Sequence, residues 1–326
     1  MGKEVIYYGE LDGSRTAQAR RLVPEDLDIG FVDPNWSSDQ KEEAMKDALV
    51  VITNGLLWST KDLAKMPKLK LLQLMSAGFN TLDILAIRRM GIEVSNNSPA
   101  IANSVAEHAI SLMLMIYKRL EQGIKGVKDG SWQEYSKSGR YGKLYELAHR
   151  TVGIVGLGNI GSRVAKRLLG FETETIFYDI REFDVSYLSK INAESVPFEV
   201  LLDRSDIVTV HVPLNSMTKG LFNSEIFKSM KSNAVFINTC RGPVHDEKAL
   251  IRALDQREIA AAGLDVFEEE PTPTSNPLLN MDNVIVTPHL AGSSQERVDN
   301  AIIFSYENAR RVLRGRKPEN CVVIDE

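Results

Sequence analysis

Short apolar runs alternate along the chain with longer stretches of helical periodicity. Such runs, bounded by polar or glycine-containing turns, predict buried strands, and the amphipathic stretches between them predict helices. This alternation is typical of α/β proteins with parallel sheets. In the first hundred residues it predicts strands at Val5–Tyr8, Ile29–Val32, Leu49–Thr53, Leu69–Met75 and Glu93–Ser95, and helices at Ser38–Ala48, Thr60–Met66 and Thr81–Met90.

A long apolar helix is expected next, over Ser104–Glu121. Ser104 and Glu107 have the spacing of a capping box, which predicts that the helix begins at Ser104. The middle of this helix is apolar on most faces, which indicates burial between domains or subunits. The polar stretch Val127–Arg150 is expected to be a connecting segment.

A second α/β series follows and predicts a doubly wound sheet of six strands. A final helix is expected over Ser293–Gly315, and Cys321–Ile324 is a candidate edge strand. The chain is therefore expected to form a discontinuous domain from residues 1–101 and 294–326, and a second domain from residues 102–293. The six strands are expected at Val152–Val155, Thr175–Tyr178, Ile207–Val210, Ala234–Asn238, Ala261–Leu264 and Val284–Val286.

Composition narrows the class of protein. A chain of 326 residues is long enough for two domains, and 43% hydrophobic with 25% charged residues is typical of a soluble globular protein. The net charge of −5 argues against a nucleic-acid partner. The N-terminus lacks the apolar core of a signal peptide, and the most apolar stretch, Ala109–Tyr117, is too short to span a membrane. Two cysteines suit a reducing compartment, so we expect a cytoplasmic protein without a membrane partner.

A glycine motif between a strand and a helix is the strongest chemical signal. Gly156, Gly158 and Gly161 form G-x-G-x-x-G, and Asp179 ends the next strand 21 residues after Gly158. In a dinucleotide-binding unit the glycines allow a tight turn, close approach of the pyrophosphate, and close packing of helix on strand. Asp179 can accept the ribose hydroxyls and repels a 2′-phosphate, so the motif predicts NAD rather than NADP. Arg181 weakens that preference slightly.

Two further strand ends carry residues suited to reduction of a 2-oxo acid. Arg241 follows the strand Ala234–Asn238, and its guanidinium can bind carboxylate and carbonyl oxygens together. His289 follows Val284–Val286, and a carboxylate beside it would fix its tautomer and favour its protonated form. Glu268, Glu269 and Glu270 are all candidates for that carboxylate, because spacing alone does not distinguish them.

The remaining candidates have more modest interpretations. His211 is expected to line the cofactor site, and Cys240 to be a packing residue. Ser76-Ala77-Gly78 follows the strand Leu69–Met75 and is either a nest of N–H groups for the substrate carboxylate or a plain glycine turn. No metal site is expected, because no cluster of ligand residues has the required spacing. Structural roles are expected for three histidines: His108, His149 and His245.

Taken together, these segments resemble the D-isomer-specific 2-hydroxyacid dehydrogenase family over essentially the whole chain. The segments that carry the resemblance are MSAGFNTLD, NSVAEHAISLMLM, GIVGLGNIGSRVAKRL, HVPLNSMTKGLFN, INTCRGPVHDEKALIRAL, AAGLDVFEEEP and NVIVTPHLAGSS. The resemblance implies a Rossmann nucleotide-binding domain with a flavodoxin-like substrate domain. It also implies NAD as cofactor, a cleft closing over it, and a homodimer built on the nucleotide domains.

The resemblance also assigns site residues. The family's catalytic arginine, glutamate and histidine fall on Arg241, Glu270 and His289. Together with the candidate nest of Ser76, Ala77 and Gly78, Arg241 is an expected substrate contact, and the family pattern implies Leu57 and Trp58 along an apolar pocket wall. The implied cofactor contacts are Gly156, Gly158, Asn159, Ile160, Gly161, Asp179, His211, Val212, Pro213, Thr239, Cys240, Asp265, His289 and Gly292.

The substrate is less sharply defined. An apolar wall favours a small or hydrophobic 2-oxo acid such as glyoxylate, hydroxypyruvate or pyruvate, or a branched one. Phosphoglycerate dehydrogenases resemble the chain too, but their phosphate-binding arginines would fall near Asn54 and Leu74, which are not basic, and the regulatory extension of longer members is missing. An NADH-sensing corepressor-like protein is an alternative of another class, since those proteins keep the same three residues.

Overall fold

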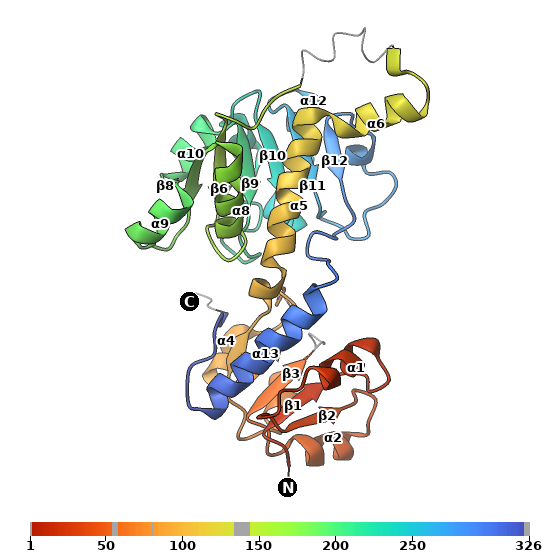
Figure 1. Cartoon of the computed structure of the whole chain (residues 1–326), viewed down its shortest axis with the longest axis vertical. Coiled ribbons are helices and arrows are strands. Elements are labelled where there is room, and N and C mark those ends of the chain that lie inside the picture. The colour runs from red at the N-terminus through yellow and green to blue at the C-terminus, as the bar shows by residue number, and fades with distance from the viewer. Residues whose placement is uncertain (1, 54–57, 80, 134–143, 323–326) are drawn as a thin grey trace. The chain divides into compact units, whose positions relative to one another are not determined.

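The structure is a computed structural model that describes residues 2–53, 58–79, 81–133 and 144–322. The chain divides into two compact units: Met1–Ile101 with Ser293–Glu326, and Ala102–Gly292. Each unit is built on one parallel sheet (Figure 1). The expected fold class of two parallel-sheet α/β domains is confirmed.

The first unit contains a five-stranded sheet in the order β2-β1-β3-β4-β5, the flavodoxin-like order. Helices cover both faces, since apolar side chains of α1 and α13 pack on one side and those of α2, α3 and α4 on the other. The strands are β1 (Val5–Tyr8), β2 (Ile29–Val32), β3 (Val50–Thr53), β4 (Leu71–Leu74) and β5 (Glu93–Ser95), and the helices are α1 (Ser14–Arg21), α2 (Ser38–Met45), α3 (Thr60–Leu63), α4 (Ile84–Arg89) and α13 (Arg297–Leu313).

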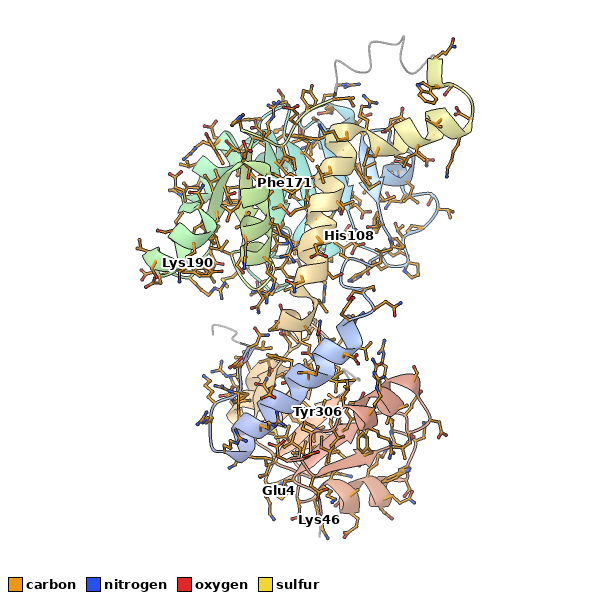
Figure 2. All side chains as sticks on the ribbon, viewed as in Figure 1. Glu4, Lys46, His108, Phe171, Lys190 and Tyr306 are labelled. Carbon is orange, nitrogen blue, oxygen red and sulfur yellow. The ribbon has the colours of Figure 1, made fainter. Side chains whose placement is uncertain are left out.

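The return of the chain to the first unit is fixed by α13. Its buried face includes Ala301, Ile302, Tyr306 and Ala309, which pack on the sheet with residues of β1 and β3. The buried hydroxyl of Tyr306, labelled in Figure 2, donates a hydrogen bond to the carbonyl of Ala19 at 2.8 Å. Helix α13 is therefore part of the core of the first unit.

The second unit contains a seven-stranded parallel sheet in the order β12-β11-β10-β9-β6-β7-β8. Beyond the six expected strands, the structure adds β8, a short edge strand in which Glu194 and Ser195 are polar and exposed. The strands are β6 (Thr151–Val155), β7 (Glu174–Tyr178), β8 (Ala193–Ser195), β9 (Ile207–Val210), β10 (Val235–Asn238), β11 (Ala261–Leu264) and β12 (Val284–Val286).

Helices cover both faces of this sheet as well. Apolar residues of α5, α8 and α9 form one core layer, while those of α10, α11 and α12 form the other. The elements are α5 (Ser98–Lys118), α6 (Leu120–Lys128), α8 (Gly161–Leu168), η2 (Leu169–Phe171), α9 (Val185–Ile191), α10 (Phe198–Arg204), α11 (Ser224–Lys228), η3 (Gly242–Val244), α12 (Glu247–Asp255) and η4 (Pro277–Asn280).

Helix α5 differs from the expectation. It begins at Ser98 rather than Ser104, so the predicted capping box is wrong. The Ser104 hydroxyl instead donates to the carbonyl of Ala291 at 2.7 Å. Among the described residues, α5 is the one helix long and apolar enough to cross a membrane by length and composition. Its apolar side chains from Ala106 to Tyr117 belong to the core of the second unit.

Two smaller differences concern the segments beside these helices. Helix α6 was not expected, and it follows α5 directly because Arg119 adopts a left-handed conformation with φ of 49°. The candidate edge strand at Cys321–Ile324 is limited to one antiparallel bridge between Ser95 and Cys321. Residues 323 and 324 lie outside the described residues.

Candidate active site

The glycine turn between β6 and α8 is closely packed at two of its three glycines. Gly156 has φ of 93°, and a Cβ atom there would lie 2.8 Å from the carbonyl oxygen of His211. A Cβ atom at Gly161 would lie 2.1 Å from the carbonyl oxygen of Gly156, so α8 needs glycine to pack on the strand. At Gly158 the nearest atom, Nη2 of Arg181, is 3.6 Å away. The turn is thus crowded on its inner side and open at Gly158.

Asp179 lies at the end of β7 beside this turn. Its carboxylate accepts hydrogen bonds from the backbone N–H of Leu157 at 2.8 Å and of Arg181 at 2.9 Å. The Arg181 guanidinium also binds it, with Nε at 3.1 Å and Nη2 at 3.0 Å. Burial raises the pKa of Asp179, but the hydrogen bonds and charge of Arg181 and the Leu157 N–H outweigh it, so the net pKa lies below the ordinary value. The carboxylate is therefore ionised.

Two buried polar atoms at the carboxyl edge of the same sheet have no hydrogen-bond partner among the described residues. They are Oγ1 of Thr239, after β10, and Nδ1 of His211, after β9. The other ring nitrogen of His211 contacts Oγ1 of Thr209 at 2.9 Å. Burial lowers the pKa of His211 to about 3, so its ring is neutral near pH 7 and cannot serve as a proton donor.

These features fit a dinucleotide. The N-terminus of α8 presents its positive dipole end to phosphates, and Gly158 leaves room for them. Asp179 can accept ribose hydroxyls, while Thr239 and His211 present unused hydrogen-bonding atoms. The other expected cofactor contacts lie on the loops at this edge: Asn159 and Ile160 in the glycine turn, Val212 and Pro213 after β9, Cys240 after β10, and Gly292 after β12.

Adjacent strands deliver the three expected catalytic residues. Strands β10, β11 and β12 are neighbours in the sheet and run parallel, so their carboxyl ends lie at one edge. Arg241 follows β10, Glu270 follows β11 and His289 follows β12. Strand order thus gathers onto one edge three residues that are widely spaced in sequence.

The imidazole of His289 is paired with Glu270. Nδ1 of His289 lies 2.6 Å from Oε2 of Glu270, and Oε1 of Glu270 accepts the backbone N–H of Phe267 at 3.0 Å. The Phe267 N–H fixes the carboxylate, and the carboxylate fixes Nδ1 as the hydrogen-bond donor. The His289 side chain is 46% exposed, which leaves Nε2 accessible within its unit. Of the three candidate glutamates, Glu270 makes this contact.

A buried carboxylate holds the loop of His289 from behind. Asp265, whose side chain is 1% exposed, accepts hydrogen bonds from Thr287 Oγ1 at 2.6 Å and from the backbone N–H groups of Leu290 and Ala291 at 2.9 and 2.8 Å. Its carbonyl accepts the N–H of His289 at 2.8 Å. Together these bonds hold His289 in the left-handed region, at φ of 51°.

Helix α5 contributes to this support. Nε2 of His108, labelled in Figure 2, lies 2.9 Å from Oγ1 of Thr287. Because Thr287 donates its hydroxyl proton to Asp265, it accepts from His108. Sequence reasoning missed Thr287 and assigned His108 only a structural role. A hydroxyl directly after a strand and opposite a buried aspartate is the signal that could have identified Thr287.

Arg241 is half-buried and lies in a tightly held loop. Its Nη1 donates to the carbonyl of Cys240 at 2.6 Å, and within the described residues its guanidinium makes no ion pair. The next residue, Gly242, touches the segment that carries Glu270, since a Cβ atom there would lie 1.8 Å from the carbonyl oxygen of Phe267. The loops of Arg241 and Glu270 are therefore in direct backbone contact.

The surroundings of Cys240 are those of a packing residue. It is buried, and its Sγ donates to Oδ1 of Asn238 at 3.0 Å. Burial raises the pKa of the Cys240 thiol to about 11, so the nucleophilic thiolate is scarce near pH 7.

The expected substrate residues of the first unit follow β3 and β4. Ser76, Ala77 and Gly78 lie in a turn-like bend that follows β4 after one residue. Trp58 packs edge-on against Tyr8, with ring centroids 4.9 Å apart, and its Nε1 donates to Oγ1 of Thr53 at 3.1 Å. Leu57 lies outside the described residues. Within the described residues, no group of three or more possible ligands forms a metal site.

Comparison with known proteins agrees with this geometry. Residues 110–291 match the family model described as "D-isomer specific 2-hydroxyacid dehydrogenase, NAD binding domain". A glyoxylate reductase of Thermofilum pendens is 38% identical, over 84% of this chain and 80% of the relative. A D-3-phosphoglycerate dehydrogenase of Methanocaldococcus jannaschii is 39% identical over 86% of this chain, but only 52% of that relative is covered.

Solved structures match as well. A D-lactate dehydrogenase from Aquifex aeolicus, solved with NAD and lactic acid, is 28% identical, with a TM-score of 0.75, and the match covers 98% of this chain and 100% of that one. Fold, site and matches define an NAD-dependent oxidoreductase. The chain belongs to the D-isomer specific 2-hydroxyacid dehydrogenase family.

The pairing of Asp179 with Arg181 generates a test of cofactor choice. In Asp179→Ser the negative charge is removed and the guanidinium is released to meet a 2′-phosphate. We expect the ratio of kcat/KM for NADPH to that for NADH to rise by about 10-fold or more, the value of one or two charged hydrogen bonds. Steady-state rates with each cofactor measure this ratio. Adding Arg181→Ala should reverse the gain, and an unchanged ratio in Asp179→Ser would contradict this role.

Proposed function

We propose that this protein reduces a small 2-oxo acid, such as glyoxylate or hydroxypyruvate, to the D-2-hydroxy acid with NADH. The observation that carries the proposal is the 2.6 Å pair of His289 and Glu270 at the carboxyl edge of an NAD-binding sheet. The likeness to a glyoxylate reductase supports a small substrate. When bound, NADH supplies the hydride that reaches the C2 carbon of the substrate.

His289 is the proton donor in this reaction. Its Nδ1 is held by Glu270, so the accessible Nε2 delivers a proton to the oxygen that becomes the hydroxyl, and takes it back during oxidation. Glu270 stabilises the imidazolium and is itself oriented by the Phe267 N–H.

Arg241 binds and polarises the substrate. Its guanidinium carries a positive charge with no acidic partner among the described residues, so a carboxylate can pair with it without displacing one. The planar fork can donate to a carboxylate oxygen and the C2 carbonyl oxygen together. In the transition state the second of these bonds strengthens as negative charge develops.

The turn at residues 76–78 is proposed to bind the substrate carboxylate. Its carbonyls are occupied: Ser76 O accepts the Asn97 N–H at 2.8 Å, Ala77 O accepts Asn96 Nδ2 at 2.8 Å, and Gly78 O accepts the Ser76 hydroxyl at 2.9 Å. None of the hydrogen bonds among described residues uses the three N–H groups of the turn. Occupied carbonyls and unused amides favour a nest over a plain turn.

Substrate size follows from the apolar surroundings in the first unit. Trp58 supports an apolar wall, and Leu74 at the end of β4 is a buried apolar residue where a phosphate would need a cation. These residues favour a small unphosphorylated acid over a phosphoglycerate. The corepressor-like alternative is not favoured by the similarity to reductases.

An assay of NADH oxidation at 340 nm (its usual absorbance band) against a panel of 2-oxo acids tests the proposal. The panel contains glyoxylate, hydroxypyruvate, pyruvate, a branched 2-oxo acid and 3-phosphohydroxypyruvate, each also tried with NADPH. We expect the highest kcat/KM for glyoxylate or for hydroxypyruvate. Tight NADH binding without turnover of any acid would favour the corepressor alternative.

Variants of the paired residues test the mechanism. His289→Gln removes the proton donor and is expected to lower kcat by about 10²- to 10⁴-fold. Glu270→Gln removes the negative charge beside the His289 imidazole and is expected to lower kcat by about 10-fold or more. Glu269→Gln, an exposed neighbour, is the matched control and should leave kcat unchanged. Parental kcat in a folded His289→Gln enzyme would exclude the mechanism.

We also propose a cytoplasmic homodimer. Both cysteines are free, which suits a reducing compartment. Helix α6, which extends away from the sheet of its unit in Figure 1, exposes Leu120, Ile124 and Val127 on one face at helical spacing. Ile124 and Val127 are 54% and 58% exposed, and such an apolar stripe favours contact with a second copy through the nucleotide-binding unit.

The oligomer is tested with Ile124→Asp, which places a charge in the middle of this stripe. Sedimentation equilibrium should show a dimer for the parent and a monomer for the variant, because burying the carboxylate in an apolar interface is unfavourable. Lys125→Asp changes an exposed charged residue next to it in sequence and should remain dimeric. A monomeric parent would refute the proposed dimer.

A further inference from the structure

The amide of Asn238 forms a clamp on the loop that carries Arg241. Asn238 ends β10 and is completely buried. Its Oδ1 accepts the backbone N–H of Cys240 at 2.9 Å and the thiol of Cys240 at 3.0 Å. Its Nδ2 donates to the carbonyl of Arg241 at 3.0 Å and contacts Nδ1 of His245 at 3.0 Å. Every hydrogen-bonding position of the amide is therefore used.

The orientation of this amide fixes the tautomer of His245. Oδ1 must face the Cys240 N–H and Nδ2 must face the Arg241 carbonyl, so Nδ1 of His245 accepts a hydrogen bond and the ring proton is on Nε2. The ring is 1% exposed and packs against Phe236, with centroids 5.8 Å apart. Burial lowers the pKa of His245 to about 4, so the ring is neutral near pH 7.

His245 makes this contact at an energetic cost. Its Nε2 is buried with no hydrogen-bond partner among the described residues. An apolar side chain of similar size would avoid that cost but would leave one N–H of the Asn238 amide without an acceptor. Stability alone therefore gives little reason for a histidine here, whereas holding the amide does.

We infer that Asn238 and His245 are positioning residues for Arg241: His245 fixes the Asn238 amide, and the amide fixes the backbone from which the guanidinium projects. The inference rests on the proposed role of Arg241 in binding the substrate. On its other side the same backbone meets Gly242, which contacts the Glu270 segment. The clamp thus sets the guanidinium relative to the His289–Glu270 pair.

A double-mutant cycle tests this inference. His245→Leu removes the acceptor for Asn238 and is expected to lower kcat/KM for the 2-oxo acid by about 3- to 10-fold, the value of one hydrogen bond, chiefly through KM. In an Arg241→Lys background, which lacks the planar fork, the same substitution should change kcat/KM by less than about 2-fold. The unfolding midpoint of His245→Leu is expected to equal or exceed that of the parent.

Two further variants sharpen the test. His245→Asn restores an acceptor in the place of Nδ1 and should return kcat/KM to within about 2-fold of the parent. Asn308→Ala removes an equally buried asparagine from the first unit, and as the matched control it should lower stability without changing kcat/KM. Should His245→Leu fail to fold, His245→Val is measured in its place.

The outcomes separate the two proposals. An unchanged kcat/KM in His245→Leu, or the same loss in both backgrounds, would overturn the positioning role while leaving the function of Arg241 intact. An unchanged kcat/KM in Arg241→Lys would instead refute the proposed role of Arg241, and the positioning role with it.

Discussion

Parallel pairing of β10, β11 and β12 is the constraint on which the site depends. In a parallel sheet every strand ends at the same edge, so the loops that follow neighbouring strands are brought together by the hydrogen-bond ladder itself. Arg241, Glu270 and His289 occupy three such loops. No contact local in sequence could bring them together, and a slip in strand register would displace one relative to the others.

Two buried polar side chains fix the conformation of these loops. Asn238 holds the loop of Arg241, and Asp265 holds the loop of His289. Each is fully buried, and each makes two hydrogen bonds from its side chain to backbone groups of its loop. Loops usually adapt to their surroundings, but a buried amide or carboxylate without partners is costly, so these two side chains strongly favour one arrangement.

Much of this architecture could be predicted from the sequence, because hydrophobic periodicity and glycine spacing reflect interactions between residues close together in the chain. Nearly all strands lie within a residue or two of their expected positions, and the fold class is confirmed. Helix α5 was misjudged because it begins at Ser98, which places Ser104 inside the helix, and the Ser104 hydroxyl bonds to the carbonyl of Ala291. Strand β8 and helix α6 were missed, since one is a short polar edge strand and the other depends on the left-handed Arg119.

For the site, too, one part could be predicted from the sequence and another part could not. Strand ends indicated Arg241 and His289, whereas spacing alone did not distinguish Glu270 from its neighbours. The family resemblance assigned Glu270, and the structure pairs it with the imidazole. The hydrogen bonds that hold the loops of these residues were not predicted from the sequence. Thr287 acts through hydrogen bonds to Asp265 and His108, which depend on how separate elements pack. Asn238 bonds to residues of the loop that directly follows it, but which of its atoms meet them depends on the conformation of that loop.

The late position of α13 in the chain has a consequence for synthesis on the ribosome. The first unit cannot complete its core until α13 emerges, because Ala301, Ile302 and Tyr306 cover one face of its sheet. The second unit is continuous in sequence, and its synthesis is complete before α13 is made. It can therefore fold while one apolar face of the first unit's sheet is still uncovered. During that interval the nascent N-terminal segment is the part of the polypeptide most in need of a chaperone.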